Sequence, residues 1–178
     1  MEMYPDTHYA ALAAGGDEGA FACLVDRYSR KVHQLILRLV DSREDAEELA
    51  QDVFMKVFRN LGSFKGECSF STWIFRIAYN TAISATRKKR PLFTPVDEGV
   101  MECLPEVSEE GGDRIAYLRR AMEALASGDA AIIMLFYMED RSVDDIASIT
   151  GLSASNVKTR LHRIRKRLFV LITQNEGV

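Results

Sequence analysis

The sequence predicts an all-α protein with two small helical domains joined by an acidic, flexible linker, the C-terminal domain being a helix-turn-helix. Apolar residues recur at helical spacing through most of the 178 residues. Residues 92–113 break this pattern with prolines, glycines and seven acids, and they contain no cation. Two short helix patterns separated by a glycine follow near the C-terminus. These observations place the domain boundary in the acidic stretch.

Composition limits the classes of function. A hydrophobic content of 47% is enough for a real core, and a net charge of -3 argues against a protein that coats nucleic acid indiscriminately. The 3 cysteines are odd in number and lack metal-type spacing, which favours a reduced, cytoplasmic setting. The sequence predicts no metal site and no cofactor. It also predicts no membrane insertion, because no apolar run is long enough to span a bilayer.

The first domain is predicted to span residues 17–91, after an N-terminal extension at 1–16. One amphipathic helix is expected from Asp17 to about Val40, and a second over residues 43–61. The outer face of the second helix is acidic in its N-terminal half, which suits the helix dipole. This face is either a solvated surface or a docking surface for a partner.

A loop and helix rich in aromatic and basic residues follow, at residues 62–91. Aromatic rings interleaved with cations suit single-stranded nucleic acid, because bases stack on rings and phosphates meet positive charge. Core packing is the alternative, above all for Trp73, which shares a helical face with Ile77. The helix is predicted to start near Ser71 and to end in four consecutive cations, residues 87–90.

The second domain is predicted to span residues 114–172, followed by a polar tail at 173–178. An apolar helix at 129–138 is expected to support the two that follow it. Ser142 and Asp145 form a capping box at the start of the next helix, and Gly151 ends it. Ser153 caps the last helix, whose apolar seam is Val157, Leu161, Ile164 and Leu168.

The side of the last helix opposite this seam has the residue types of a DNA recognition helix. Short polar or forked side chains can reach base edges, and cations beside them can meet phosphates. A solvated basic helix is the alternative for such a face. The predicted DNA-reading residues are Ser155, Asn156, Lys158, Thr159, Arg160, His162, Arg163 and Lys166.

Two ordered blocks resemble a known family. The blocks DAEELAQDVFMKVFRNLGSFKGECSFSTWIFRIAYNTA and DDIASITGLSASNVKTRLHRIRKRL are similar to those of bacterial sigma factors of the extracytoplasmic-function subgroup, and the resemblance covers about residues 17–172. It implies a promoter-specificity subunit of RNA polymerase with no catalytic residue. It also implies docking on the clamp helices of the polymerase's largest subunit through Asp45, Glu48, Gln51, Asp52, Met55, Lys56 and Arg59.

The same resemblance gives both DNA interfaces a role. The helix-turn-helix would read the duplex minus-thirty-five element, and the aromatic and basic segment would capture the single non-template strand of the minus-ten element. An anti-sigma factor is an expected partner. The residues implied for the minus-ten strand are Phe64, Lys65, Phe70, Trp73, Arg76, Asn80, Arg87, Lys88, Lys89 and Arg90.

A stand-alone helix-turn-helix regulator that binds duplex DNA as a dimer is the alternative function. No separate dimerisation helix is evident in the sequence for such a protein. An enzyme is the weakest reading, because the histidines are scattered and no phosphate-binding loop or nucleophile motif is present.

Overall fold

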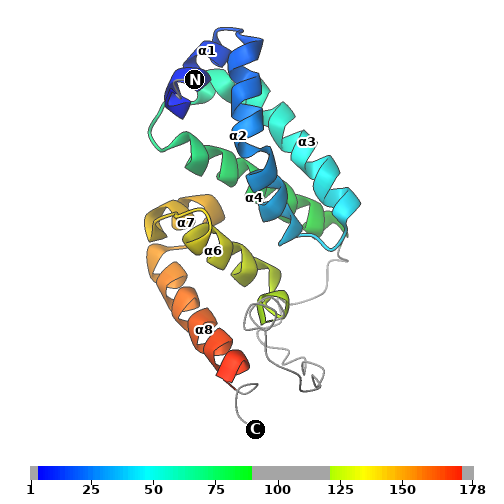
Figure 1. Cartoon of the computed structure of the whole chain (residues 1–178), viewed down its shortest axis with the longest axis vertical. Helices are drawn as coiled ribbons and strands as arrows, with labels where there is room; N and C mark the ends of the chain where they lie inside the picture. The colour runs from blue at the N-terminus through cyan, green and yellow to red at the C-terminus, as the bar shows by residue number, and fades with distance from the viewer. Residues whose placement is uncertain (1–3, 90–120, 174–178) are drawn as a thin grey trace, which may run out of the picture.

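The computed structural model describes residues 4–89 and 121–173, and its regular structure within these ranges is entirely helical (Figure 1). This confirms the all-α prediction. The predicted linker at 92–113, Arg90 and residues 114–120 of the predicted second domain lie outside the described residues. None of the described helices is long and apolar enough to cross a membrane.

The first domain is built from α1 (Asp6–Ala14), α2 (Glu18–Leu37), α3 (Arg43–Asn60), the short 3₁₀ helix η1 (Leu61–Ser63) and α4 (Phe70–Lys89). Asp17 caps α2 by accepting a 2.9 Å hydrogen bond from the backbone of Ala20. Ser42 caps α3 in the same way, through the backbone N–H of Asp45 at 3.2 Å. The apolar faces of α2, α3 and α4 meet in a core that contains Leu24, Val32, Leu35, Ile36, Val53, Val57, Ile74, Phe75 and Ala78.

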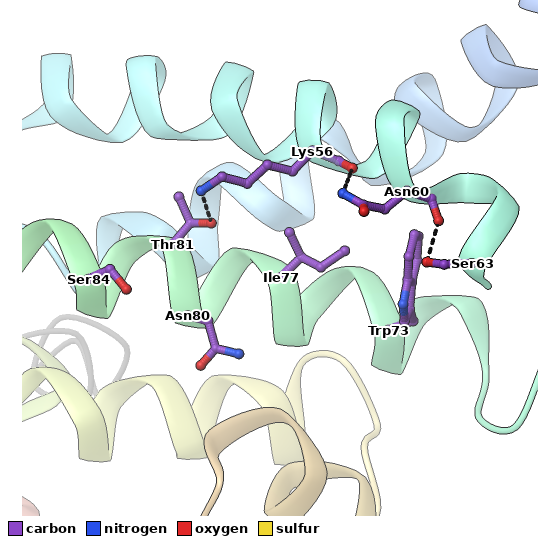
Figure 2. A pocket seen from close by; sticks show the side chains of 8 residues that line it. All are labelled: Lys56, Asn60, Ser63, Trp73, Ile77, Asn80, Thr81 and Ser84. Atoms are coloured by element: carbon purple, nitrogen blue, oxygen red, sulfur yellow. Dashed lines mark hydrogen bonds between the residues drawn. The ribbon is translucent and has the colours of Figure 1, made fainter. Parts of the chain in front are cut away.

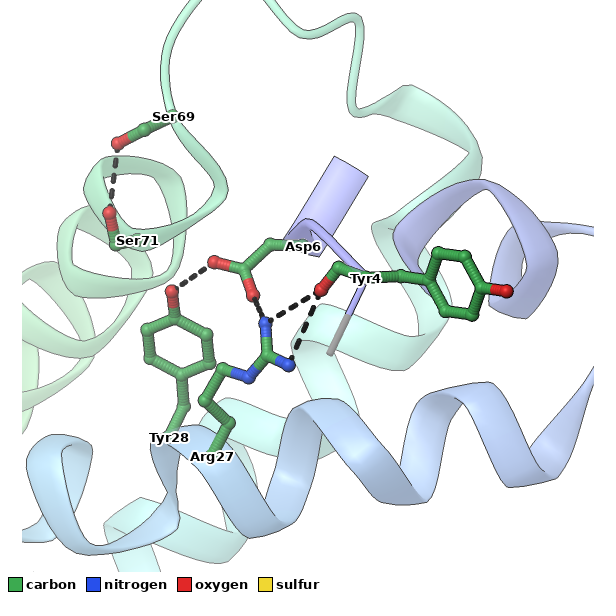
Figure 3. Close-up of polar contacts among 6 residues, drawn as sticks. All are labelled: Tyr4, Asp6, Arg27, Tyr28, Ser69 and Ser71. Atoms are coloured by element: carbon green, nitrogen blue, oxygen red, sulfur yellow. Dashed lines mark hydrogen bonds and ion pairs between the residues drawn. The ribbon is translucent and has the colours of Figure 1, made fainter. Parts of the chain in front are cut away.

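A network of polar contacts fixes the N-terminal helix to this domain (Figure 3). The carboxylate of Asp6 accepts hydrogen bonds from the guanidinium of Arg27 and from the hydroxyl of Tyr28. Burial, followed by the hydrogen bond to Asp6, raises the pKa of Tyr28 well above its ordinary value. The phenol therefore stays neutral and serves as a hydrogen-bond donor beneath α1.

The second domain contains α6 (Ser127–Tyr137), α7 (Val143–Thr150) and α8 (Ala154–Thr173). The predicted capping box is present at α7, because the Ser142 hydroxyl accepts from the Asp145 backbone and the Asp145 carboxylate accepts from the Ser142 backbone. Gly151 ends α7 with φ of 75°, a conformation that glycine adopts without strain. The buried helix α6 supports the α7–α8 pair, as predicted for residues 129–138.

The two domains touch through the end of α6, the start of α7 and the first turn of α4. Lys31 Nζ of α2 lies 2.9 Å from Glu139 Oε2, whose side chain is only 6% exposed. Arg141 Nη1 donates to Ser71 Oγ at 2.6 Å, and Thr72 Oγ1 donates to Asp145 Oδ1 at 2.8 Å. Helix α7 therefore lies against α4, and α8 extends beyond it (Figure 1).

Candidate nucleic-acid interface

A hollow of about 380 Å³ opens between α3 and α4 (Figure 2). Its walls differ in chemistry. Trp73 and Ile77 supply an apolar wall, and the amide of Asn80 lies on the exposed side of α4. The full lining is Lys56, Asn60, Ser63, Trp73, Ile77, Asn80, Thr81 and Ser84.

Hydrogen bonds hold the polar wall of this hollow in place. Lys56 Nζ donates to Thr81 Oγ1 at 3.0 Å and thereby bridges the two helices. Asn60 Nδ2 donates to the Lys56 carbonyl at 2.7 Å, and Ser63 Oγ donates to the Asn60 carbonyl at 2.6 Å, as Figure 2 shows. These bonds fix the polar side chains at the junction of α3 and η1, which limits their conformational freedom.

The aromatic residues predicted to take part in strand capture form one cluster. Phe64 lies with its ring centroid 5.5 Å from that of Phe70 and 5.2 Å from that of Trp73. Phe70 is 1% exposed and Trp73 8% exposed, so both belong largely to the core, whereas Phe64 is half-buried. Phe70 therefore supports the loop from beneath, Trp73 presents its remaining surface to the hollow, and Phe64 is the ring of the three with the most access to solvent.

Cations surround this part of the first domain. Lys65 is exposed in the loop, and Arg76 is exposed on α4. Arg87 and Lys88 are exposed near the end of α4, while the side chain of Lys89 and all of Arg90 lie outside the described residues. Of the predicted minus-ten residues, the exposed cations and Asn80 are thus available to a strand of nucleic acid.

The outer face of α3 is exposed as predicted and borders an apolar groove. Glu48, Gln51, Asp52 and Arg59 are exposed, and Asp45 is partly buried. Met55 is 51% exposed and, with Gln51, lines a groove of about 920 Å³ between α2 and α3. The other groove residues are Glu18, Phe21, Val25, Ser29, His33, Glu47, Ala50, Phe54 and Phe58.

The side chain of Lys56 points away from the rest of the predicted docking face. Its ammonium points toward α4 and lines the hollow, as described above. The periodicity of α3 could not show this, because a long side chain on the border of two faces can reach either neighbour.

The side of α8 that was predicted to read DNA is open to solvent, and its opposite side is buried. Val157, Leu161 and Ile164 are at most 3% exposed, as the predicted seam requires. Ser153 caps the helix by accepting from the Asn156 backbone at 3.2 Å. The exposed residues on the reading side are Ser155, Asn156, Lys158, Thr159, His162, Arg163 and Lys166.

Arg160 differs from the other predicted reading residues. Its guanidinium lies 3.5 Å from the carboxylate of Asp129, at the start of α6, and its side chain is 33% exposed. Arg160 therefore joins α8 to α6. Sequence position alone could not reveal this, because Asp129 lies 31 residues earlier in the chain.

Two ionisable groups report on the contact between the domains. Burial would raise the pKa of Asp145, but hydrogen bonds from Ser142 and Thr72 hold it below its ordinary value. Burial raises the pKa of Tyr79 on α4, where the charges of Arg160 and Asp129 act in opposite directions. Tyr79 thus lies within electrostatic reach of the second domain.

Several residues of the hollow were not predicted from the sequence as site residues: Asn60, Ser63, Ile77, Thr81 and Ser84. Spacing of four residues already relates Lys56 to Asn60, Ile77 to Thr81 and Asn80 to Ser84, and such pairs share a helical face. That signal places each pair on one face, but only the fold shows that these faces oppose one another.

Comparisons with known proteins identify the two halves separately. The family model described as Sigma-70 region 2 matches residues 24–91, and that described as Sigma-70, region 4 matches residues 115–168. The ECF RNA polymerase sigma factor SigW of Bacillus subtilis is 32% identical over 169 residues, covering 86% of this chain and 89% of that protein. The ECF RNA polymerase sigma-E factor of Escherichia coli is 32% identical over 166 residues, covering 86% of each.

Solved structures share the fold. CnrH, in complex with the cytosolic domain of CnrY, matches with a TM-score of 0.68 and 24% identity over 95% of this chain and 97% of that chain. The sigma factor RpoE of Bartonella quintana, in complex with the anti-sigma factor NepR, matches with a TM-score of 0.66 and 24% identity over 86% of this chain and 96% of that chain.

Proposed function

The chain belongs to the ECF family of RNA polymerase sigma factors, and on that premise we propose that it directs core polymerase to specific promoters and assists their melting. The observation that carries this proposal is the joint presence of an open reading face on α8 and a preorganised hollow on the first domain. The two surfaces suit two forms of DNA, a duplex and an unpaired strand. The chain acts by binding, without catalysing a reaction.

The hollow between α3 and α4 is proposed to receive a base flipped out of the minus-ten element. Unstacking a base costs a few kcal/mol, and a pocket that stacks on the base and hydrogen-bonds its edge offsets this cost. Trp73 and Ile77 offer the apolar surface, and the amide of Asn80 can both donate and accept. Lys65, Arg76, Arg87 and Lys88 would meet the phosphates of the strand.

The exposed face of α8 is proposed to read the minus-thirty-five duplex. Lys158, Thr159, His162 and Arg163 lie on the open side, opposite a seam that fixes the helix against α6 and α7. A helix held in this way can enter the major groove with its side chains already oriented.

The outer face of α3 is proposed to dock on the clamp helices of the polymerase. It offers acidic residues, Glu48 and Asp52, beside the exposed side chain of Met55 and the apolar groove. Exposed apolar surface rimmed by charges is typical of a protein interface. Because this partner is a cytoplasmic enzyme, the chain is proposed to act in the cytoplasm.

The remaining assignments complete the proposal. Residues 17–91 form the domain that docks and captures the strand, and residues 114–172 form the domain that reads the duplex. Residues 92–113 link them, with extensions at 1–16 and 173–178. An anti-sigma partner is proposed because the structural relatives CnrH and RpoE were solved with CnrY and the anti-sigma factor NepR, respectively.

Transcription with purified core polymerase tests the function. The chain is expected to produce run-off transcripts from a defined subset of promoters in a library of genomic fragments, and core polymerase alone is expected to produce none of them. If the chain instead binds a two-fold operator tightly without polymerase and supports no transcript, it is a stand-alone regulator and the proposal is wrong.

A further inference from the structure

Helix α1 has no part in the function proposed above, yet ionised and hydroxyl groups tie it to the first domain. The family model for region 2 matches from residue 24 onward, so α1 lies outside it. Asp6, in the first turn of α1, accepts hydrogen bonds from the guanidinium of Arg27 and the hydroxyl of Tyr28 (Figure 3). Hydrogen bonds to an ionised group are stronger than those between neutral groups. The polar attachment of α1 to α2 therefore centres on one carboxylate.

Tyr28 links this carboxylate to the aromatic cluster beside the hollow. Tyr28 is 5% exposed, and its ring centroid lies 5.5 Å from that of Phe70. The ring centroid of Phe70 lies 5.5 Å from that of Phe64 and 5.7 Å from that of Trp73. Aromatic pairs at these distances attract one another, and a closely packed interior leaves its rings little room to move independently. An unbroken series of contacts thus joins α1 to Phe64 in the loop and to Trp73 in the hollow.

A second set of contacts joins Tyr28 to the end of the same loop. The hydroxyl of Ser71, in the first turn of α4, acts on the pKa of Tyr28 through a hydrogen bond, so it lies beside the phenol. Ser71 Oγ also lies 2.9 Å from Ser69 Oγ, as Figure 3 shows. Ser69 is the last residue of the loop and caps α4 by accepting from the backbone N–H of Thr72 at 3.1 Å. The phenol is therefore adjacent both to the aromatic cluster and to the helix start where the loop ends.

Helix α1 also packs directly on both neighbours of this loop. It lies against η1, which precedes the loop, and against α4, which follows it. The loop itself, residues 64–69, lies outside the helices and carries Phe64 and Lys65, which are proposed to meet the strand. A binding loop takes its position from the rigid elements around it. The position of this loop therefore depends on elements that rest on α1.

We propose that Asp6 is a positioning residue for capture of the minus-ten strand. Acting through Tyr28 and Phe70, it holds the loop and the adjoining wall of the hollow in the form that receives an unpaired strand. This inference rests on the proposed sigma-factor function and gives α1 a part in it. A site that is ordered before its ligand arrives avoids the cost of ordering during binding. Loss of the Asp6 carboxylate should therefore weaken strand capture and leave the other binding surfaces unchanged.

The variant Asp6→Asn tests this proposal, because it keeps the size of the side chain and removes its charge. Asp26→Asn is the matched control, since it makes the same change of charge at an exposed position on α2. Tyr28→Phe removes the hydrogen bond from the other partner. If Asp6 acts through Tyr28, the two effects should not add, and the double variant should behave much like Asp6→Asn alone. Circular dichroism checks that each variant is folded.

Fluorescence of the free, full-length chain gives the first readout. Trp73 is the single tryptophan of the chain and lines the hollow, so its emission reports on this site. Because Trp73 is only 8% exposed, acrylamide should quench it weakly in the wild type and in Asp26→Asn. Quenching should be steeper in Asp6→Asn and in Tyr28→Phe. Equal quenching in Asp6→Asn and the wild type would overturn the inference.

Binding by holoenzyme, assembled from core polymerase and each variant, gives the second readout. Anisotropy of a labelled minus-ten single strand should show that Asp6→Asn binds about fivefold more weakly than the wild type, the effect of ordering one or two side chains on binding. Affinity for core polymerase and for a minus-thirty-five duplex should stay at the wild-type level.

The outcomes separate this inference from the function on which it rests. Wild-type affinity of Asp6→Asn for the strand would overturn the inference and leave the function intact. Equal losses for the strand, the duplex and core polymerase would show a general loss of structure, and they would also overturn it. If the wild-type holoenzyme itself binds no minus-ten strand, the proposed function is wrong, and the inference falls with it.

Discussion

The ammonium of Lys56 on α3 donates a 3.0 Å hydrogen bond to the hydroxyl of Thr81 on α4, across the hollow of the first domain. This bond places a cation beside Thr81, in the lining of the hollow where a captured base is proposed to lie. The resemblance to sigma factors implied that the same residue lies on the polymerase-docking face. A role in the hollow and a role in docking predict different effects of replacing Lys56.

Replacement of Lys56 by Ala is expected to weaken the binding of a minus-ten single strand by the holoenzyme. If its charge meets a phosphate, the slope of log affinity against log salt should become shallower by about 0.7, the value for one contact on a single strand. Fluorescence anisotropy of a labelled oligonucleotide over a range of salt concentrations measures this slope. Thr81→Val is the control, because it removes the hydrogen bond but keeps the charge, and its slope should stay unchanged. Loss of core-polymerase binding with an unchanged slope would return Lys56 to the docking face.

Charge reversal on the outer face of α3 is expected to weaken assembly with core polymerase. The double variant Gln51→Lys, Asp52→Lys adds a positive charge at Gln51 and reverses the charge of Asp52. Both side chains are exposed, so the fold should be unaffected while affinity falls at least tenfold. Biolayer interferometry with core polymerase measures the affinity, and circular dichroism checks the fold. Asp26→Lys, at an exposed position on α2, is the control for two of the three added positive charges. Unchanged affinity of the double variant would move the docking surface elsewhere.

Local features of this fold were predictable from the sequence because their causes are local. The capping box of Ser142 and Asp145, the left-handed Gly151 and the buried seam of α8 follow from spacing and residue type. The exposed polar and basic face of α8 follows from the same spacing.

Contacts between distant segments were beyond such reasoning. Asp145 caps its own helix as predicted, but it also accepts from Thr72, which lies 73 residues earlier. Arg160 is among the predicted DNA-reading residues of the last helix, yet it pairs with Asp129. Phe70 has the residue type of a stacking platform, and its burial against Tyr28 and Phe64 depends on how the helices pack. In each case the residue type sets the chemistry of the side chain, and the tertiary fold determines which residue it contacts.

The two arginines on α8 are expected to behave differently. Arg163 is exposed on the reading side, so Arg163→Ala should cost about 1 to 3 kcal/mol on the preferred promoter and relax specificity at one base pair. Arg160→Ala should lower the stability of the second domain slightly and leave sequence preference unchanged, because its partner is Asp129. Binding of a library of minus-thirty-five duplexes by the holoenzyme measures both. A uniform loss over all sequences for Arg163→Ala would assign that side chain to a phosphate.

The polar network of Asp6, Arg27 and Tyr28, which fixes α1, is expected to make the first domain sensitive to alkaline pH. Tyr28 has a raised pKa in the folded chain because of burial and its hydrogen bond to Asp6, whereas an unfolded tyrosine titrates near pH 10. The folded state therefore favours the neutral phenol, and this contribution to stability is fully present below about pH 10. Above that pH the unfolded chain loses the proton first, and the contribution declines by about 1.4 kcal/mol per pH unit until the folded phenol titrates.

The variant Tyr28→Phe tests whether Tyr28 causes this decline in stability at alkaline pH. At pH 7 the variant should be less stable by about 1 kcal/mol, because the hydrogen bond to Asp6 is lost. Between pH 10 and pH 11 the wild type should lose about 1 kcal/mol more than the variant does, so the gap between them should close. Urea unfolding followed by circular dichroism at both ends of this range measures the difference. Tyr4→Phe, at a position 48% exposed, should keep the alkaline loss of the wild type. An equally steep loss in Tyr28→Phe would mean that another group causes the alkaline transition.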